Sequence, residues 1–300
     1  MTEPSDAGKR SRTARAHGAP DFPHGSRLRP SIRKYLSYAV LTVGALIVLF
    51  PLYMTLVSSL LTQSEYVAQP PVFFPIHPQW DAYSKAFIQG DMWKYFVNSI
   101  QQTLLIVVGS TVTSVLAAWA FAAYEFPLKR ILWALVLSTL LIPFEVTIVV
   151  NVQTIDSLGL SNSIVALALP FMMSAFGIFL LRQAFRGISK ELREAATLDG
   201  DSSIGFLWRV ALPLVRPQLA SYLVISALAA WNQYLWPLIL TTNSSAHRTI
   251  QIGLKTLNST TFKNYDVVLA GAVIASVPVF ILMIIFNKQL IRSLNAGAVK

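Results

Sequence analysis

The chain of 300 residues is 54% hydrophobic and only 13% charged, with a mean hydropathy of +0.54 and a net charge of +10. About a quarter of the residues of an ordinary soluble domain are charged, so this composition excludes a typical soluble protein and a wholly disordered one. The absence of cysteine excludes a disulfide scaffold and a cysteine-ligated metal site, and the histidines are too scattered to indicate another metal centre.

Residues 1–33 are rich in Ser, Pro, Gly, Ala and Arg and lack apolar periodicity, so we expect a disordered, basic cytoplasmic tail. Its charge either contacts anionic lipid or a partner, or serves only as a topology signal and solvated linker. The apolar run that follows is too long for the h-region of a signal peptide. We therefore expect it to be retained as the first membrane span.

Six long segments with few or no charges follow the tail. They comprise residues 35–64, 95–124, 131–156, 157–181, 217–247 and 267–287. Each contains the roughly 20 apolar residues that cross a hydrocarbon layer of about 30 Å as a helix. Unalternating apolar runs do not suit barrel strands, so we predict an all-α integral membrane protein with six transmembrane helices in a permease domain of residues 34–300.

The loop after the first span and the third span itself each have a distinctive feature. Residues 65–94 begin with a Pro-rich run and continue with aromatic residues, which predicts a short helix at the membrane interface. The third span carries Glu145, two residues after Pro143, which is expected to bend the helix. A carboxylate at a helix centre costs about 2.5–3.5 kcal/mol. Glu145 therefore either faces the bundle interior or a water-filled path and accepts hydrogen bonds from a substrate, or lies near the outer end of the span and pairs with a neighbour.

The loop between the fourth and fifth spans, about residues 186–217, carries the signals of a helical hairpin. Ser189 can cap a first helix, and Gly200 can end it in the left-handed conformation. Asp201 and the serines after it can cap a second short helix that ends near Pro213.

This hairpin offers a surface to another protein. Ala195 and Ala196 leave a flat patch where another backbone can approach, and Leu198 and Phe206 are expected to serve as apolar anchors. The alternative is that the hairpin only covers the inner mouth of the bundle.

The fifth span contains the run Trp-Asn-Gln-Tyr-Leu-Trp-Pro-Leu. Its candidate substrate-path residues are Trp231, Asn232, Gln233 and Tyr234. Aromatic rings stack on the apolar faces of polyols, and amides exchange hydrogen bonds with hydroxyls. Helical spacing would place Trp231, Tyr234 and Leu235 on one face. The alternative role for the segment is packing and hydrogen bonding between helices.

Nineteen of the 24 Lys and Arg residues fall in the tail, in the loop after the second span, in the hairpin loop and at the C-terminal end. Cytoplasmic loops carry this kind of excess, so both termini and the hairpin are expected in the cytoplasm. The other five are Lys85, Lys94, Arg248, Lys255 and Lys263.

The hairpin sequence Glu-Ala-Ala-x-x-Asp-Gly, followed by an apolar stretch and Pro213, resembles the EAA loop of ABC importer permeases. The family usually has Ala where this chain has Asp201. The resemblance implies that the loop inserts into a groove on a cytoplasmic ATPase subunit and transmits its nucleotide-driven closure. The coupling residues it implies are Glu194, Ala195, Ala196, Leu198, Asp199 and Gly200.

A finer resemblance covers roughly residues 35–300. The run at 231–238 is similar to the fifth-helix signature of the carbohydrate-uptake branch, the maltose-type second permeases. Within that branch, residues 141–146, 179–183 and 232–234 are most similar to glycerol-3-phosphate or glycerophosphodiester permeases. A sugar or an oligosaccharide is the alternative substrate.

The sequence contains neither a phosphate-binding Gly-x-x-x-x-Gly-Lys loop nor a credible catalytic cluster, so we expect a non-catalytic subunit without a cofactor, with ATP and Mg on a partner ATPase. The resemblance implies a homologous permease, two cytoplasmic ATPase subunits and an extracellular or periplasmic solute-binding protein as partners, in the inner (cytoplasmic) membrane. Nucleic acid is not expected to bind. The competing class is an ion-coupled secondary transporter, which often shows paired repeats and intramembrane charges.

Overall fold

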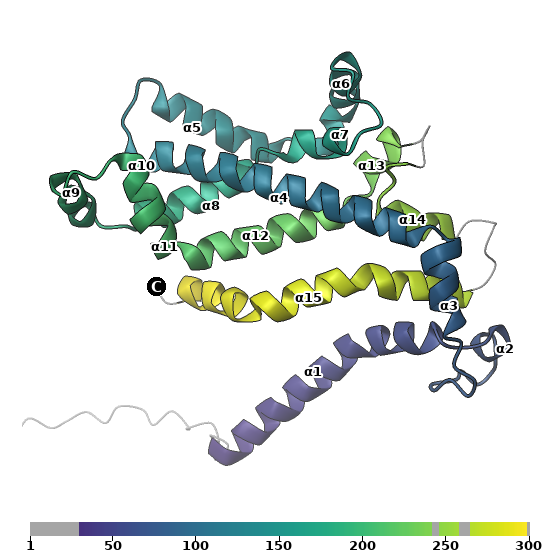
Figure 1. Ribbon diagram of the computed structural model, residues 1–300. Helices are drawn as coiled ribbons and strands as arrows, with labels where there is room; N and C mark the ends of the chain where they lie inside the picture. The colour runs from purple at the N-terminus through teal and green to yellow at the C-terminus, as the bar shows by residue number, and fades with distance from the viewer. Residues whose placement is uncertain (1–29, 242–245, 258–264, 299–300) are drawn as a thin grey trace, which may run out of the picture. The chain divides into compact units, whose positions relative to one another are not determined.

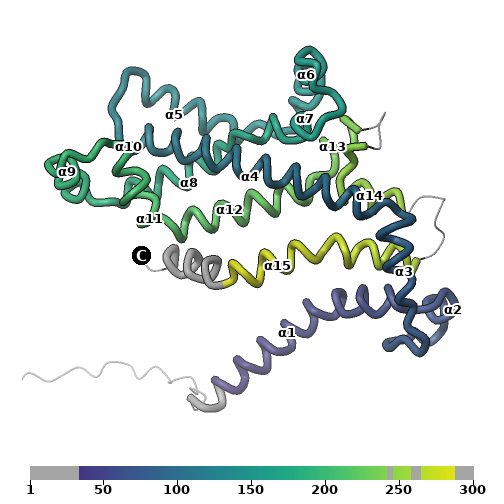
Figure 2. Tube along the Cα trace, viewed as in Figure 1, coloured from purple at the N-terminus to yellow at the C-terminus, as the bar shows by residue number. Residues whose placement is uncertain are grey.

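The computed structural model describes residues 30–241, 246–257 and 265–298, and every regular element in those ranges is a helix (Figures 1 and 2). The predicted tail, residues 1–33, lies outside the described residues except for its last four, which begin helix α1 (Pro30–Ser58). The chain divides into two compact units, residues 1–51 and 52–300.

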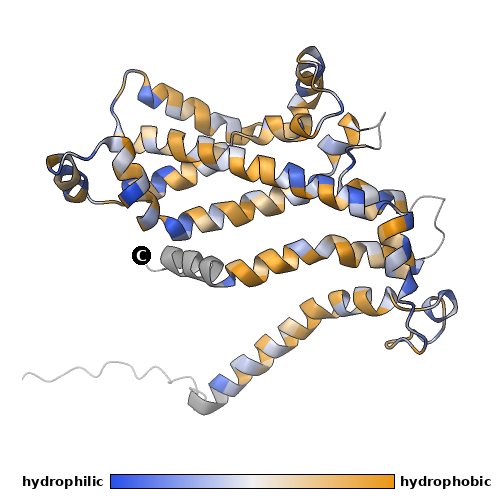
Figure 3. Cartoon of the chain, viewed as in Figure 1, coloured by the Kyte–Doolittle hydropathy of each residue, from blue (hydrophilic) through white to orange (hydrophobic). Residues whose placement is uncertain are grey.

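Three helices are long and apolar enough to cross a membrane as single elements. They are α1, α4 (Met92–Ala123) and α15 (Tyr265–Ala298). Orange, hydrophobic residues make up most of the described length of these helices in Figure 3. Helices α1 and α15 continue through Pro51 and Pro278, respectively. These three helices correspond to the first, second and sixth predicted spans.

The other spans are built from bent helix pairs. The first pair joins α5 (Lys129–Ser138) and η2 (Thr139–Leu141) to α6 (Phe144–Ser157). The second joins α7 (Ile164–Ala168) and η3 (Leu169–Phe171) to α8 (Ala175–Arg186). The third joins α10 (Ser203–Phe206), η4 (Leu207–Ala211) and α11 (Leu212–Leu214) to α12 (Arg216–Trp231). Their bends are 103°, 49° and 81°. The described chain thus has three candidate spans, or up to six if each pair is one span.

The sharpest of these bends has a local cause. Ile142 is extended, with φ −93° and ψ 113°, because the ring of Pro143 disfavours the helical conformation in the residue before it. Pro143 itself also lacks the N–H that would continue the helix of α5. The predicted bend is confirmed, and it is large enough to divide the expected third span into two helices.

The expectation that the helix of the fifth span continues through residues 231–236 is wrong. Helix α12 ends at Trp231, Asn232 is its C-cap, and α13 (Leu235–Leu240) begins after a short break. Pro237 explains the break, because it has no N–H to donate to the carbonyl of Gln233 and its ring would clash there. The helical spacing expected to place Trp231, Tyr234 and Leu235 on one face therefore does not apply.

The remaining described helices are short. They are α2 (Gln63–Tyr66), α3 (Asp81–Ser84), η1 (Lys85–Gln89), α9 (Lys190–Leu198) and α14 (Ile250–Leu257). Helices α3 and η1 confirm the short helical segment predicted before the second span.

Helix α4 is the centre of the unit formed by residues 52–300, where it packs against α7, α8, α12 and α14 (Figure 1). The face of α4 in these contacts carries buried polar residues at four-residue spacing: Asn98, Gln102, Ser110 and Ser114. Small and polar residues let membrane helices approach closely and bond to each other. Ser110 Oγ lies 3.2 Å from Ser226 Oγ, for example.

Candidate functional site

The helical hairpin forms through the predicted caps. The Ser189 hydroxyl accepts a hydrogen bond from Leu192 N at 3.3 Å and starts α9. Gly200 has φ +81° and ends this helix in the left-handed region. The Ser202 hydroxyl accepts from Gly205 N at 3.0 Å and starts α10. The local prediction is thus confirmed at both caps and at the turn.

One face of the hairpin is open to a partner. Glu194, Ala195, Asp199 and Gly200 are exposed, and the Leu198 side chain, at 88% exposure, is among the most exposed apolar side chains of the described residues. The described chain therefore leaves this face of α9 uncovered.

The opposite face of the hairpin packs inward. Phe206 is only 2% exposed, and its ring stacks on Trp119 of α4 with centroids 5.8 Å apart. The expectation that Phe206 is an anchor for a partner is therefore wrong, because that side chain attaches the hairpin to its own bundle. Ala196 is half-buried and packs against the same cluster.

Two polar contacts fix the hairpin further. Arg193 of α9 donates to the carbonyl oxygen of Ala123, in the last turn of α4, at 3.3 Å. Helix C-terminal carbonyls lack intrahelical partners, so a guanidinium is a favourable cap there. Asp201, the departure from the family pattern, forms an ion pair with Arg209 across the second half of the hairpin. A movement of α9 is thus mechanically linked to the central helix.

The break between α12 and α13 is the second candidate region. Gln233 is half-buried, and Gln102 Nε2 of α4 donates to its side-chain oxygen at 2.6 Å. Asn232 is exposed, donates to Leu228 O at 2.9 Å and accepts from Gln251 Nε2 of α14 at 3.3 Å. Amides from three helices therefore meet where the fifth span is unwound.

Tyr234 lies in the same break and has an unusual environment. Its hydroxyl is buried and has no hydrogen-bond partner in the described part of the chain. The Lys255 ammonium of α14 lies 5.2 Å from its ring centroid, within the range of a cation–π contact. A buried hydroxyl without a partner costs about 1–3 kcal/mol, so a ligand that reaches it gains a hydrogen bond.

Trp231 has a packing environment. It is 4% exposed, its Nε1 donates to Ala275 O of α15 at 3.0 Å, and its ring meets Phe96 edge to face. These contacts attach α12 to α15 and α4. Trp231 therefore packs between helices, whereas its sequence neighbours Asn232, Gln233 and Tyr234 belong to the break between α12 and α13.

Glu145 lies in the first turn of α6, after the bend at Pro143, and it is exposed in this chain. It forms no ion pair with the described residues, so the expected pairing with a neighbour is not found there. Its place beside a water-filled path stays a prediction. Because carboxylates are favourable near helix N-termini, its position in the first turn of α6 partly offsets the cost of the charge.

Two parts of these regions were not predicted. The partners of the break, Gln102 and Lys255, were missed, although the four-residue spacing of polar residues along 98–114 was a readable signal.

The described residues contain no group of three or more His, Asp or Glu side chains placed to hold a metal ion.

Comparison with known proteins agrees with this arrangement. Residues 110–295 match the family described as "Binding-protein-dependent transport system inner membrane component". The chain is 34% identical over 268 residues to the arabinooligosaccharides transport system permease protein AraQ of Halalkalibacterium halodurans, covering 87% of this chain and 96% of the relative. It is 31% identical to the sn-glycerol-3-phosphate transport system permease protein UgpE of Yersinia pestis, covering 86% and 94%.

Solved structures show the same fold. A bacterial ABC transporter involved in the import of the acidic polysaccharide alginate has a chain that superposes with a TM-score of 0.78 at 26% identity, covering 89% of this chain and 99% of that one. A second alginate transporter structure, in complex with a pentasaccharide-bound periplasmic protein, has a chain with a TM-score of 0.61 at 16% identity, covering 86% and 94%.

Proposed function

Because this chain belongs to the binding-protein-dependent family of inner membrane components, the non-catalytic permeases of ABC importers, we propose that it forms, with a second homologous permease, the pathway of an importer for glycerol-3-phosphate or a glycerophosphodiester. Two cytoplasmic ATPase subunits would supply the energy through bound ATP and Mg. A solute-binding protein would deliver the substrate from outside. The protein would lie in the inner membrane of the cell, with both termini and the hairpin in the cytoplasm.

The observation that carries the coupling part of this proposal is the exposed face of α9. It presents Glu194, Ala195, Leu198 and Asp199 beside the left-handed turn at Gly200. The inner side of the hairpin is attached to α4 through Arg193 of α9 and Phe206 of α10. An ATPase that grips α9 can therefore move the central helix of the bundle, and ATP-driven closure would switch the pathway from inward- to outward-facing access.

The charge near the helix break supports an anionic substrate. Lys255 is exposed beside Tyr234, and no carboxylate of the described residues forms an ion pair with it. An unneutralised ammonium at a pathway favours an anion such as a phosphate ester. Glu145 is on a different helix, α6, and has no contact with this group in the described chain.

An acidic oligosaccharide is the second candidate substrate, and a specific observation favours it. A carboxylated sugar would be attracted by Lys255 as a phosphate ester is, and its rings would stack on Tyr234. An oligosaccharide is larger than a glycerol phosphate and needs further aromatic side chains on which its rings can stack.

The solute-binding protein that purifies with the complex separates these substrates. Its affinity should be measured by calorimetry for glycerol-3-phosphate, glycerophosphocholine, arabino-oligosaccharides and oligouronides. Submicromolar binding of a glycerol phosphate supports the proposal, whereas tight binding of an oligouronide alone supports the second candidate. Tight binding of an arabino-oligosaccharide alone would contradict both.

Removal of the Tyr234 ring is expected to reduce uptake. The variant Tyr234→Ala should transport about tenfold more slowly, since a ring contact of about 1.5 kcal/mol corresponds to that factor. Assembly with the partner subunits should be normal, because the ring lies at a break and not in a packed helix. Uptake of labelled substrate into vesicles measures the first effect, and co-purification measures the second.

The exposed Tyr124, at the other end of α4, provides the control. Tyr124→Ala should transport at a rate within about two-fold of the unchanged protein, as expected for a surface substitution. Equal uptake by Tyr234→Ala and Tyr124→Ala would remove Tyr234 from the pathway.

A further inference from the structure

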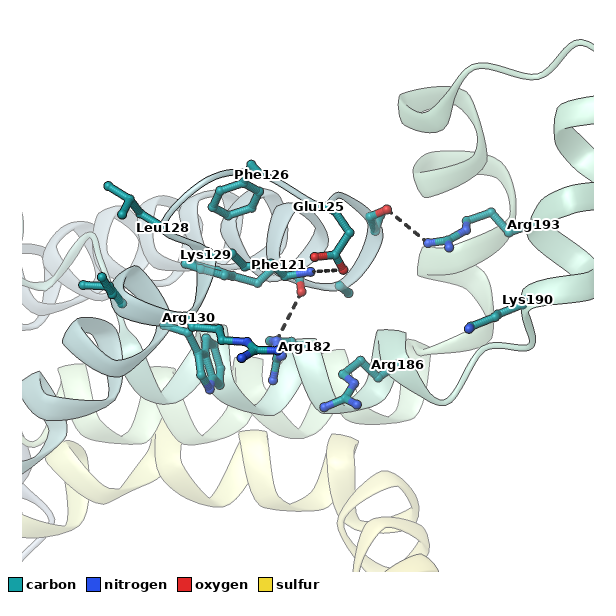
Figure 4. A pocket seen from close by; sticks show the side chains of 14 residues that line it. Phe121, Glu125, Phe126, Leu128, Lys129, Arg130, Arg182, Arg186, Lys190 and Arg193 are labelled. Atoms are coloured by element: carbon teal, nitrogen blue, oxygen red, sulfur yellow. Dashed lines mark hydrogen bonds and ion pairs between the residues drawn. The ribbon is translucent and has the colours of Figure 1, made fainter.

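A cavity of about 920 Å³ lies where the end of α4, the start of α5, the end of α8 and the start of α9 meet (Figure 4). Its lining is strongly basic and includes one carboxylate, Glu125. Six cations line it: Lys129, Arg130, Arg182, Arg186, Lys190 and Arg193. The coupling and pathway roles described above use only Arg193 of this set.

Most of this charge is not neutralised. Lys129 Nζ lies 2.9 Å from Glu125 Oε1, and this hydrogen bond lowers the pKa of the Glu125 carboxyl, so the pair is neutral overall. Arg130, Arg186 and Lys190 are exposed, and in the part of the chain that the structure describes they form no ion pair. Several positive charges so close together are unfavourable unless an anion joins them.

Arg182 is held in place at the wall of the cavity. Its guanidinium lies 4.0 Å from the Trp133 ring centroid, and its Nε donates to the carbonyl of Phe121 at 3.3 Å. These two contacts fix a half-buried side chain and leave the terminal nitrogens for another acceptor. A fixed guanidinium matches two oxygens of a phosphate group.

The other wall of the cavity is apolar. It includes Phe126, Leu128 and Ile131, and the last two are 66% and 57% exposed. The exposed apolar surface continues along α5 through Leu132 and Leu135, which suits contact with acyl chains. A soluble phosphate would use the cations and leave this apolar wall in water.

We propose that this cavity binds the phosphate headgroup of an anionic phospholipid of the cytoplasmic leaflet, between Arg182, Arg186 and Arg130. The leaflet assignment rests on the orientation given in the proposed function. Basic pockets between membrane helices on the cytoplasmic side recognise such headgroups. Lys190 and Arg193 belong to α9, so a bound lipid also connects the coupling helix to α4, α5 and α8.

The test measures lipid binding to the assembled transporter in detergent by native mass spectrometry. Dioleoylphosphatidylglycerol and dioleoylphosphatidylcholine are titrated separately, and inorganic phosphate is added as a soluble competitor. The cavity variant is Arg130→Gln/Arg186→Gln. The control variant is Arg216→Gln/Arg248→Gln, which removes the same charge from positions that do not line the cavity and form no ion pair in the described chain.

Phosphatidylglycerol should bind at least about tenfold more tightly than phosphatidylcholine, and the cavity variant should lose about 25-fold in affinity, at roughly five-fold for each of its two cations. The control variant should bind as the unchanged complex does. Equal affinity of the cavity variant and the control variant for phosphatidylglycerol would overturn the proposal. So would a result in which millimolar inorganic phosphate displaces phosphatidylglycerol and phosphatidylcholine to the same extent. ATP-dependent uptake is measured separately in phosphatidylcholine vesicles. This second measurement tests the proposed permease function independently of the lipid site.

Discussion

Gly200→Pro is expected to abolish the stimulation of ATP hydrolysis by the solute-binding protein, with a fall of at least about tenfold, because coupling between sites amounts to 1–3 kcal/mol. Proline has φ near −65° and cannot adopt the +81° of Gly200. It also removes the hydrogen bond from Gly200 N to Thr197 O, which is 3.1 Å long. The end of α9 would therefore unwind and displace Leu198 and Asp199. ATPase assays of the reconstituted complex, with and without the binding protein, measure this effect.

Gly159 provides a closely matched control. It has φ +67° and follows α6 as Gly200 follows α9. Its N–H donates to Asp156 O at 3.0 Å, and no atom lies within 4 Å of an added Cβ at either glycine. Gly159→Pro should unwind its own helix end but retain stimulated ATPase activity within about two-fold. Loss of stimulation in both variants would show that the effect of Gly200→Pro is general and not specific to the hairpin.

Gly177→Leu is expected to destabilise the bundle by about 3 kcal/mol, because overpacking a filled interface forces backbones apart. A Cβ at Gly177 of α8 would lie 2.5 Å from Ser114 Oγ of α4 and 2.5 Å from Tyr222 Cζ of α12. Tyr222 is 1% exposed and has no room to move aside. The three helices therefore cannot keep their separation. The temperature at which half of the detergent-solubilised protein aggregates should fall.

Ala134→Leu is the comparison for this substitution. Ala134 lies within α5, and its side chain is exposed in the described chain. A leucine there should leave the aggregation temperature nearly unchanged, within about 0.5 kcal/mol of stability. If Gly177→Leu aggregates at the same temperature as Ala134→Leu, the close approach of α8 to α4 is not a source of stability.

The hairpin was predictable because its signals are local. A serine before a helix, a glycine after it and a proline beyond the second helix each act on backbone groups a few residues away. The same locality explains the confirmed bend at Pro143. Phe206 was misassigned because exposure depends on what folds against a side chain, and its neighbour Trp119 lies 87 positions earlier in the sequence.

The helix breaks were harder to predict from composition. Pro51 and Pro278 lie inside continuous helices, whereas Pro237 follows a break, so the residue type alone does not decide between these outcomes. In a membrane helix the freed backbone groups can be satisfied by neighbouring helices, side chains or ordered water, and composition does not reveal these partners. At the break after α12, the contact of Gln233 with Gln102 joins residues that are far apart in the sequence.

The basic cavity was also hidden from the sequence for this reason. Its cations occur in two separate loops, and each loop alone reads as a topology signal. Packing of α8 beside α4 and α5 turns these separate charges into one site. Charge counting thus predicted the side of the membrane but not the cavity.

Vesicle transport by the isolated chain tests the central claim most directly. We expect the purified polypeptide, reconstituted alone under an ion gradient, to move no solute, and the complex with the second permease, the ATPases and the binding protein to transport only when ATP is supplied. Uptake by the isolated chain, or by the complex without ATP under an intact ion gradient, would contradict the account and support an ion-coupled secondary transporter.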